Sequence, residues 1–208
     1  MKSKKEVRTL PLTELRITNN EENTYIQGHA AVFDSWSETL GGMFPFKERV
    51  KRGAFTQSLE KDDIRALFNH DPNYVLGRNK SGTLELLEDE KGLSVKIKPP
   101  DTTWARDLKI SIERGDINQM SFGFSVEEDE WSSEEGTDVR ELRKVKLFDV
   151  SPVTFPAYPE TEVGVRAMEA YENYRAEVRS KEEKENKAAE KIAAKRKINN
   201  LKIKWRYL

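Results

Sequence analysis

Apolar residues alternate with polar ones along several short segments of this chain, and this period-two pattern constrains the fold more than any other feature. It is clearest in Thr83–Leu87 and Leu93–Ile97, where Leu, Val or Ile recurs at every second position. Side chains of a strand point alternately to its two faces, so each segment predicts a strand with one buried face. The charged segment 88–92, which ends in Gly92, supplies a loop between them. We therefore expect the two strands to pair as a hairpin.

Similar patterns predict that residues 1–168 form a strand-rich domain. Loops are expected at 34–45, which holds two glycines and a proline, at the turn sequence 71–73, and in the acidic segment 127–138. With two short helices added, these segments predict an α+β fold that is mostly β. The further strands are expected at Leu12–Thr18, Thr24–Phe33, Ile64–His70, Met120–Val126 and Val139–Val150.

The two helices are predicted from apolar spacing and from capping residues. A short helix is expected at Ala54–Leu59. A second should follow a Pro-Pro pair, with Asp101 or Thr102 as its cap, because apolar residues recur every four positions across Trp104–Ile112. Gly115 lies where the end of a helix favours a left-handed residue.

The composition changes near residue 168. A Pro-rich stretch, Pro152–Pro159, closes the first domain, and residues 169–208 carry five more basic than acidic side chains although the net charge of the whole chain is −1. The tail is rich in good helix formers, but its apolar stripe is thin, which predicts a helix that is marginal alone or a disordered segment. We therefore expect a folded domain over 1–168 and a charged tail over 169–208.

Missing residue types exclude several classes of function. The chain has no cysteine and only two histidines, which excludes disulfides, thiolate catalysis and metal sites rich in histidine or cysteine. The basic N-terminal segment lacks the apolar run of a signal peptide, and no stretch approaches the roughly 20 apolar residues of a membrane helix. We expect a protein without a cofactor that stays in the compartment where it is made.

The expected strand Met120–Val126 carries the first candidate for chemistry. Alternation places Phe122, Phe124 and Val126 on one face and small residues, including Ser121, on the other. The small residues leave room for another chain to approach the Ser121 hydroxyl. The alternative is that they pack beneath a helix or a second sheet.

Asp149 is the second candidate, because aspartate is depleted in strands and this one lies between Phe148 and Val150. We expect Phe148 and Val150 to share one face, and Leu147, Asp149 and Ser151 the other. The carboxylate then either bonds a buried partner or faces water on an edge strand.

The third candidate is a histidine. His70 would end the strand 64–70, and a lone histidine there more often has a structural role than a catalytic one. A structural role is the alternative for His29 as well. A nucleophilic serine needs an adjacent base, and the base needs a group that orients it. Ser121, His70 and Asp149 can fill these three roles.

Seven short motifs occur in order along residues 11–167 and together resemble one family. Singly they are weak, but the complete ordered set is similar to the prohead serine proteases of tailed bacteriophages, which are related to the herpesvirus assembly proteases. The motifs are Gly28–Phe33, Gly53–Phe55, Asn69–Asp71, Leu76–Arg78, Arg114–Asp116, Met120–Phe124 and Phe148–Tyr158.

The resemblance implies the roles of the three candidates. The catalytic histidine of the family falls on His70 and its nucleophile on Ser121. Its third member, an acidic residue just before a Val-Ser-x-Val-Thr segment, falls on Asp149. The herpesvirus enzymes use a second histidine here, but the other histidine of this chain lies far upstream. The implied fold is a closed or nearly closed antiparallel β-barrel with flanking helices.

The resemblance also implies a biological role. The expected activity is a serine endopeptidase, working through an acyl-enzyme, that cleaves scaffold or the scaffold-like N-terminal segment of the major capsid protein, and also itself. We expect it to act in the host cytoplasm inside the immature capsid. The capsid protein and scaffold are the expected partners. A homo-oligomer is expected too, because such an enzyme must stay inactive before assembly and oligomerisation is one possible switch.

Two other classes of function remain open at this point. One is a catalytically silent assembly factor with the same fold. The other is a nucleic-acid-binding barrel that uses the basic, aromatic end 201–208, which ranks last because the rest of the chain is acidic and would repel phosphates. The tail itself either docks to scaffold or coat protein, is a solvated end, or is removed during maturation.

Overall fold

The computed structural model describes residues 5–9, 15–19, 23–42, 45–155 and 165–204. They belong to two compact units, Met1–Gly164 and Val165–Leu208, which are described separately below. Predictions that fall on residues 12–14, 156–159 and 205–208 lie outside the described residues.

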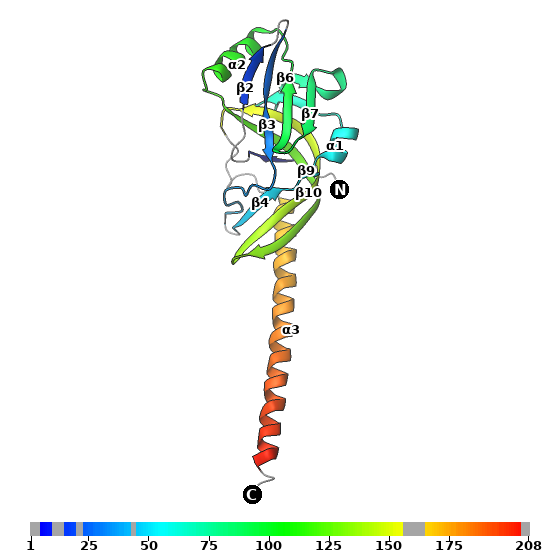
Figure 1. The fold of residues 1–208 in the computed structure, drawn as a ribbon, viewed down its shortest axis with the longest axis vertical. Coiled ribbons are helices and arrows are strands. Elements are labelled where there is room, and N and C mark those ends of the chain that lie inside the picture. The colour runs from blue at the N-terminus through cyan, green and yellow to red at the C-terminus, as the bar shows by residue number, and fades with distance from the viewer. Residues whose placement is uncertain (1–4, 10–14, 20–22, 43–44, 156–164, 205–208) are drawn as a thin grey trace. The chain divides into compact units, whose positions relative to one another are not determined.

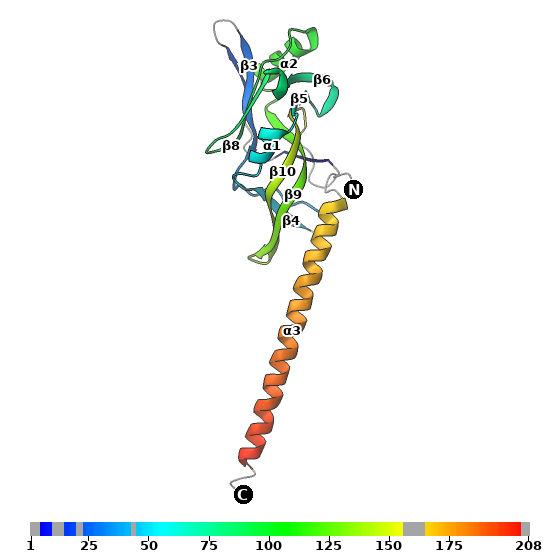
Figure 2. The same ribbon diagram turned by 90° about the vertical axis from the view of Figure 1, so that its right-hand side faces the viewer.

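Two sheets build the first unit (Figures 1 and 2). The larger sheet has the order β1 (Glu6–Arg8), β9 (Gln119–Glu134), β10 (Thr137–Val153), β5 (Arg65–Phe68) and β6 (Asp71–Arg78), with β4 (Phe46–Val50) also on β10. The smaller sheet has the order β2 (Leu15–Asn19), β3 (Thr24–Val32), β8 (Gly92–Ile97) and β7 (Leu84–Glu88). Neighbouring strands are antiparallel, except that β4 and β5 each run parallel to β10. The strand pattern of the sequence does not predict these two parallel pairs.

Both sheets curl around one apolar core, giving the mostly β fold with flanking helices that the sequence predicts (Figure 1). Phe55 packs edge-on against Phe122, with ring centroids 5.5 Å apart, and Phe122 lies 4.8 Å from Phe124. Helix α1 (Thr56–Lys61) packs beside β10 and α2 (Thr103–Glu113) beside β2. A short 3-10 helix, η1 (Asn79–Ser81), precedes β7.

Several predicted elements are present within a residue or two. The β7–β8 hairpin has the expected facing pairs, such as Leu86 opposite Val95. Helix α2 has Thr102 as its N-cap residue, and Gly115 after its end adopts the expected left-handed conformation with φ of 82°. The short strands β1 and β4 were not predicted.

The predicted acidic loop at 127–138 is wrong, because β9 and β10 continue through it as a long hairpin. Acidic side chains on β9 face basic ones on β10, as in the ion pair of 3.2 Å between Glu128 and Lys144. The hairpin closes at Glu135 and Gly136, whose φ values of 50° and 80° fit the two-residue turn that matches strand twist. A run of one charge thus belongs to a strand when the facing strand carries the opposite charge.

The predicted strand 64–70 is also too long. It ends at Phe68, a two-residue turn follows at Asn69 and His70, and β6 begins at Asp71, where a turn was predicted.

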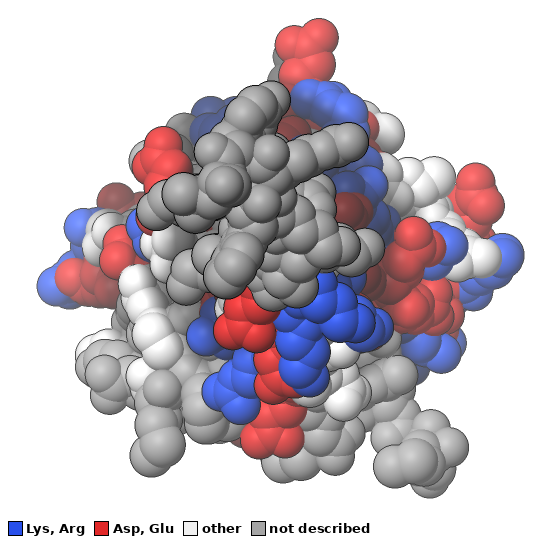
Figure 3. Space-filling view, turned by 90° about the horizontal axis from the view of Figure 1, so that it is seen from below, with Lys and Arg blue, Asp and Glu red and all other residues white. Residues whose placement is uncertain are grey.

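The second unit is the helix α3 (Val165–Lys204), so the tail is helical (Figure 1). Among its described side chains, Glu183 and Lys187 form an ion pair one turn apart at 3.9 Å. On the face of the molecule in Figure 3, acidic and basic side chains are interspersed rather than separated. None of the helices among the described residues is long and apolar enough to span a bilayer.

Replacing Phe55 by alanine tests the core. The ring is fully buried between Phe33 and Phe122, so Phe55→Ala should lower the free energy of unfolding by about 3–5 kcal/mol. Urea denaturation followed by tryptophan fluorescence measures this change. Leu87→Ala is the control, because Leu87 is largely exposed and should cost less than about 0.5 kcal/mol. Equal losses in both variants would contradict this assignment of the core.

Candidate active site

Ser121 lies on β9, on the face of the strand opposite its phenylalanines. Phe122 and Phe124 enter the core, as alternation predicts, and Ser121 and Gly123 occupy the other face. The Ser121 side chain is itself fully buried, and β1 pairs with the adjoining residues of β9. Its hydroxyl oxygen is 2.9 Å from the main-chain oxygen of Arg8 on β1.

Asp149 lies directly across from Gly123, and Ser151 directly across from Ser121, on the paired strand β10. The predicted faces of β10 are wrong at one point. Leu147 is a core residue together with Val150, whereas Phe148 is only half-buried. The cause is a shift in the pairing register between Leu147 and Asp149, a β-bulge that reverses the alternation. The bulge lets Leu147 and Val150 enter the core while Asp149 stays on the face of Ser121.

His70 reaches the site from the turn between β5 and β6, not from the end of a strand. Both turn residues have positive φ, 51° at Asn69 and 59° at His70. This conformation costs a non-glycine residue of order 1–3 kcal/mol, so the turn needs support. Asn69 provides it: its N–H donates to the Pro152 oxygen at 3.0 Å, and its side-chain oxygen accepts from the Thr154 N–H at 2.9 Å. The turn is thereby attached to the end of β10.

The three predicted residues come together. His70 Nε2 lies 2.8 Å from the Ser121 Oγ, and His70 Nδ1 hydrogen-bonds the Asp149 carboxylate. A carboxylate only accepts, so the Nδ1 proton is donated to Asp149, and in neutral His70 this leaves the Nε2 lone pair facing the serine hydroxyl. This arrangement can take a proton from the hydroxyl.

The Asp149 carboxylate is almost completely buried, and both of its oxygens have partners. Oδ2 accepts from His70 and, at 3.2 Å, from the Ser151 hydroxyl, while Oδ1 pairs with the Lys5 ammonium group. Burial alone would raise the pKa of the Asp149 carboxyl. The hydrogen bond and charge of His70, followed by those of Lys5, outweigh burial and hold this pKa below its ordinary 3.8. Asp149 therefore remains ionised at neutral pH.

Gly123 makes room for this arrangement. A Cβ atom at Gly123 would lie 2.4 Å from the Lys5 Cε and 2.6 Å from the Asp149 Oδ1, closer than atoms can approach. The absence of a side chain at this position allows the carboxylate and the ammonium group to meet above β9.

The prediction from sequence omitted Lys5, Ser151 and Asn69. Ser151 carried a usable signal, because it lies two residues after Asp149 and was placed on the same face of the strand. Asn69 stands in the motif Asn69–Asp71, but its role depends on the conformation of a turn that the motif does not indicate. Lys5 had no signal, because it comes from a remote segment.

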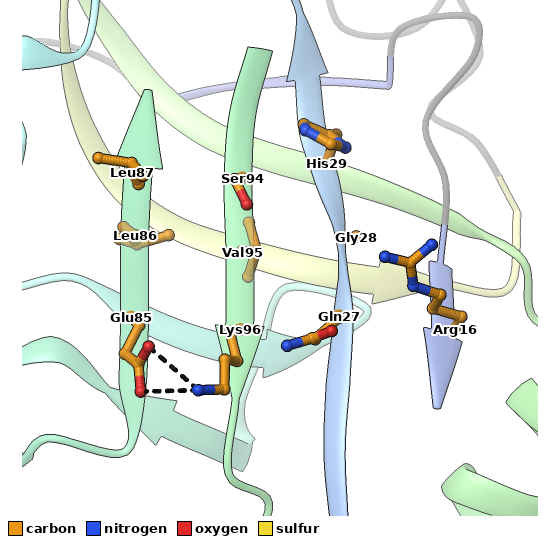
Figure 4. A pocket seen from close by; sticks show the side chains of 10 residues that line it. All are labelled: Arg16, Gln27, Gly28, His29, Glu85, Leu86, Leu87, Ser94, Val95 and Lys96. Atoms are coloured by element: carbon orange, nitrogen blue, oxygen red, sulfur yellow. Dashed lines mark hydrogen bonds and ion pairs between the residues drawn. The ribbon is translucent and has the colours of Figure 1, made fainter. Parts of the chain in front are cut away.

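The second histidine takes no part in the site. His29 Nε2 pairs with the Asp89 carboxylate at 2.8 Å, beside a polar depression of about 360 Å³ on the smaller sheet (Figure 4). Arg16, Glu85 and Lys96 also line this depression. Among the residues that the structure describes, no group of three or more His, Asp or Glu side chains is arranged to hold a metal ion.

Comparison with known proteins gives three findings. A family model described as caudovirus prohead serine protease matches residues 12–176, a range that contains all three predicted site residues. A prohead protease of Enterobacteria phage HK97 is 29% identical over 164 residues, covering 77% of this chain and 67% of that protein. The solved structure of the bacteriophage T4 capsid assembly protease matches with a TM-score of 0.45 and 12% identity, covering 75% of this chain and 100% of that chain.

The lowered pKa of Asp149 predicts how stability depends on pH. As pH falls from 5 to 3, the unfolded chain takes up a proton at this carboxyl near its ordinary pKa, while folded Asp149 stays ionised to lower pH. The stabilisation is thus present above the ordinary pKa and is lost as pH falls through the folded one. Asp149→Asn lacks the stabilisation that the ionised carboxylate provides. This variant should therefore be about 1–3 kcal/mol less stable than wild type at pH 5, and the difference should shrink towards pH 3.

Urea unfolding at each pH measures this difference. Asp101→Asn is the control, because the Asp101 side chain is exposed, and this variant should follow wild type. A difference between Asp149→Asn and wild type that stays constant from pH 5 to pH 3 would show that the Asp149 carboxyl has no depressed pKa.

Proposed function

The chain belongs to the caudovirus prohead serine protease family, as its motifs predict, and from this premise we propose that it is a serine endopeptidase. In this proposal Ser121 is the nucleophile, His70 is the general base and Asp149 orients His70. The observation that supports the proposal is the continuous hydrogen-bond path from Ser121 through His70 to Asp149. These residues come from three separate elements, and serine, histidine and carboxylate in this order are what acyl transfer to a hydroxyl requires.

The proposed reaction has two stages. His70 Nε2 takes the proton of the Ser121 hydroxyl as its oxygen attacks the scissile carbonyl carbon, and it then gives this proton to the leaving amine, which produces an acyl-serine. His70 Nε2 then takes a proton from water as the water oxygen attacks the acyl carbon. The bond from that carbon to the Ser121 oxygen breaks, the same nitrogen returns its proton to this oxygen, and the new carboxyl terminus is released. Asp149 holds the Nδ1–H tautomer and stabilises the imidazolium that forms in both stages.

The biological role is proposed from the family and from the matching phage protein, which is named a prohead protease. We place this chain in the immature phage capsid, where it cleaves scaffold, the scaffold-like N-terminal segment of the major capsid protein, and itself. A high substrate concentration inside a shell makes modest affinity sufficient. The helix α3, with charges of both signs, is a candidate for docking to scaffold or coat protein.

One observation favours a second candidate, a catalytically silent assembly factor. Ser121 is fully buried in this structure, so a substrate carbonyl has no access to it while β1 is in place. The two candidates differ in whether the Ser121 hydroxyl can become reactive.

A fluorophosphonate probe distinguishes these candidates, because it reacts covalently only with an activated serine. Wild type assembled with coat protein should be labelled at Ser121, and Ser121→Ala should remain folded and unlabelled. The control Ser125→Ala, which removes a buried hydroxyl four residues further along the same face of β9, should keep its labelling. Unlabelled wild type under these conditions would favour the assembly factor, and labelling of Ser121→Ala would place the nucleophile elsewhere.

Co-expression with the coat protein tests the proposed substrate. With wild type, mass spectrometry should find coat protein shortened at its N-terminus. With Ser121→Ala the coat protein should keep its full mass, because removing the nucleophile lowers turnover by on the order of 10⁴-fold or more. Full-length coat protein in the wild-type culture as well as in the Ser121→Ala culture would show that the coat protein is not a substrate.

A further inference from the structure

The strand β1 occupies the edge of β9 in the manner of a bound peptide. It is three residues long and antiparallel, with Glu6 opposite Phe124, Val7 opposite Gly123 and Arg8 opposite Phe122. An extended peptide binds to a sheet edge by the same main-chain pairing. This edge lies beside Ser121, so any peptide cleaved there by strand addition must take the place of β1.

The side chains of β1 do not have the pattern of a core strand. Its one apolar side chain, Val7, is only half-buried, while Glu6 and Arg8 are each 4% exposed. A strand that serves the core would bury valine and expose the charges. The charged side chains of β1 instead enter a polar pocket, as those of a ligand would.

The pocket that receives Arg8 is built for a cation. The Arg8 Nε donates to the Glu48 Oε1 at 2.9 Å, and the Arg8 guanidinium carbon lies 5.7 Å from the centre of the Phe124 ring. Glu48 and Phe124 are fully buried parts of the domain, not of β1. A carboxylate combined with an aromatic face is a recognition site suited to guanidinium.

The charge that remains without β1 is negative. The Glu48 Oε2 accepts from Arg140 at 2.9 Å, and Arg140 also donates to Asp129 at 2.7 Å. The strand β1 brings one charge of each sign, because Glu6 pairs with Arg8 at 2.8 Å and lies 3.6 Å from Arg140. Without β1, Arg140 keeps Glu48 and Asp129 as partners, whereas the Glu48 Oε1 loses the donor that Arg8 provided. A buried carboxylate oxygen without a partner is costly, so this pocket favours a peptide that brings a basic side chain.

The main chain of β1 also keeps the serine from reacting. The Ser121 hydroxyl has one proton, and the Arg8 oxygen, at 2.9 Å, competes for it with His70 Nε2, at 2.8 Å. When the proton is donated to Arg8, His70 cannot accept it. Lys5 meanwhile pairs with the Asp149 oxygen that His70 does not use, and so offsets part of the charge that would stabilise the imidazolium.

We propose that β1 is a built-in inhibitory strand, and that the substrate replacing it is an extended peptide with arginine, or another basic residue, placed in the pocket of Glu48 and Phe124. Since the Arg8 oxygen lies at the Ser121 hydroxyl, the basic residue is the one that contributes the scissile carbonyl. This pocket belongs to the proteolytic site proposed above and depends on that function.

The first test measures how fast a fluorophosphonate labels Ser121 in the full-length protein. Lys5→Ala/Arg8→Gln weakens β1 and should be labelled about tenfold faster than wild type or more, because both changes remove charge-assisted contacts of the strand. The control Lys80→Ala/Arg114→Gln removes the same charges from exposed positions and should react like wild type. Equal rates in all three proteins would overturn the inhibitory role of β1.

The second test uses peptides in trans on the Lys5→Ala/Arg8→Gln protein. An end-blocked peptide with the sequence of residues 4–9, KKEVRT, should protect Ser121 from the probe. The same peptide with citrulline, the neutral isostere of arginine, should need an about tenfold higher concentration, and Glu48→Gln should remove this difference. If Glu48→Gln does not fold, the comparison of the arginine and citrulline peptides still decides whether the pocket prefers a basic side chain.

Equal protection by the arginine and citrulline peptides would overturn the basic subsite even if the protein is an active serine hydrolase. A protein whose Ser121 reacts in no variant and under no assembling condition would instead refute the proteolytic function, and this inference with it.

Discussion

The buried carboxylate of Asp149 is the constraint on which the site depends. A charge removed from water is stable only if its oxygens receive donors, and here they come from His70, Ser151 and Lys5. Ser151 lies on β10 with Asp149, but His70 and Lys5 come from remote parts of the chain, so the carboxylate holds those parts in register while β1 is in place. The same demand accounts for Gly123, because any side chain there would separate the carboxylate from the ammonium group.

Two local irregularities make this convergence possible, and both are unfavourable by themselves. The bulge before Asp149 interrupts the β9–β10 ladder, and the turn at His70 holds a non-glycine residue at positive φ. The surrounding structure supports each: Leu147 and Val150 bury their side chains on either side of the bulge, and Asn69 attaches the turn to β10. Strain maintained in this way places the imidazole between the hydroxyl and the carboxylate, and the core of aromatic rings supplies the stability that offsets it.

The sequence predicted the parts of the site that depend on alternation alone. Phe122 and Phe124 face the core and Ser121 lies on the opposite face, because β9 is regular there. The faces around Phe148 were predicted wrongly because one extra residue reverses the alternation, and no property of Phe148 itself announces a bulge. His70 was placed in a strand because apolar alternation continues through Phe68, whereas the turn is decided by the contacts of Asn69 with β10. The role of β1 was beyond prediction, since the sequence Glu6-Val7-Arg8 reveals nothing until its partners Glu48 and Ser121 are known.

Substrate can displace a tethered inhibitory strand only when the substrate concentration is high enough. A segment that belongs to the same chain as its site competes with free peptides at an effective concentration of about the millimolar range, so even weak binding keeps the site filled in dilute solution. Free substrate at micromolar concentration cannot displace it, but substrate confined with the enzyme in a shell can reach a comparable concentration. The contacts of β1 fit displacement by concentrated substrate. Its charge pairing is enough to select a basic side chain, but its buried apolar surface is too small to hold the strand permanently. On this reasoning, confinement would act as the switch, and the acidity of the pocket that holds Arg8 would determine which peptide takes its place.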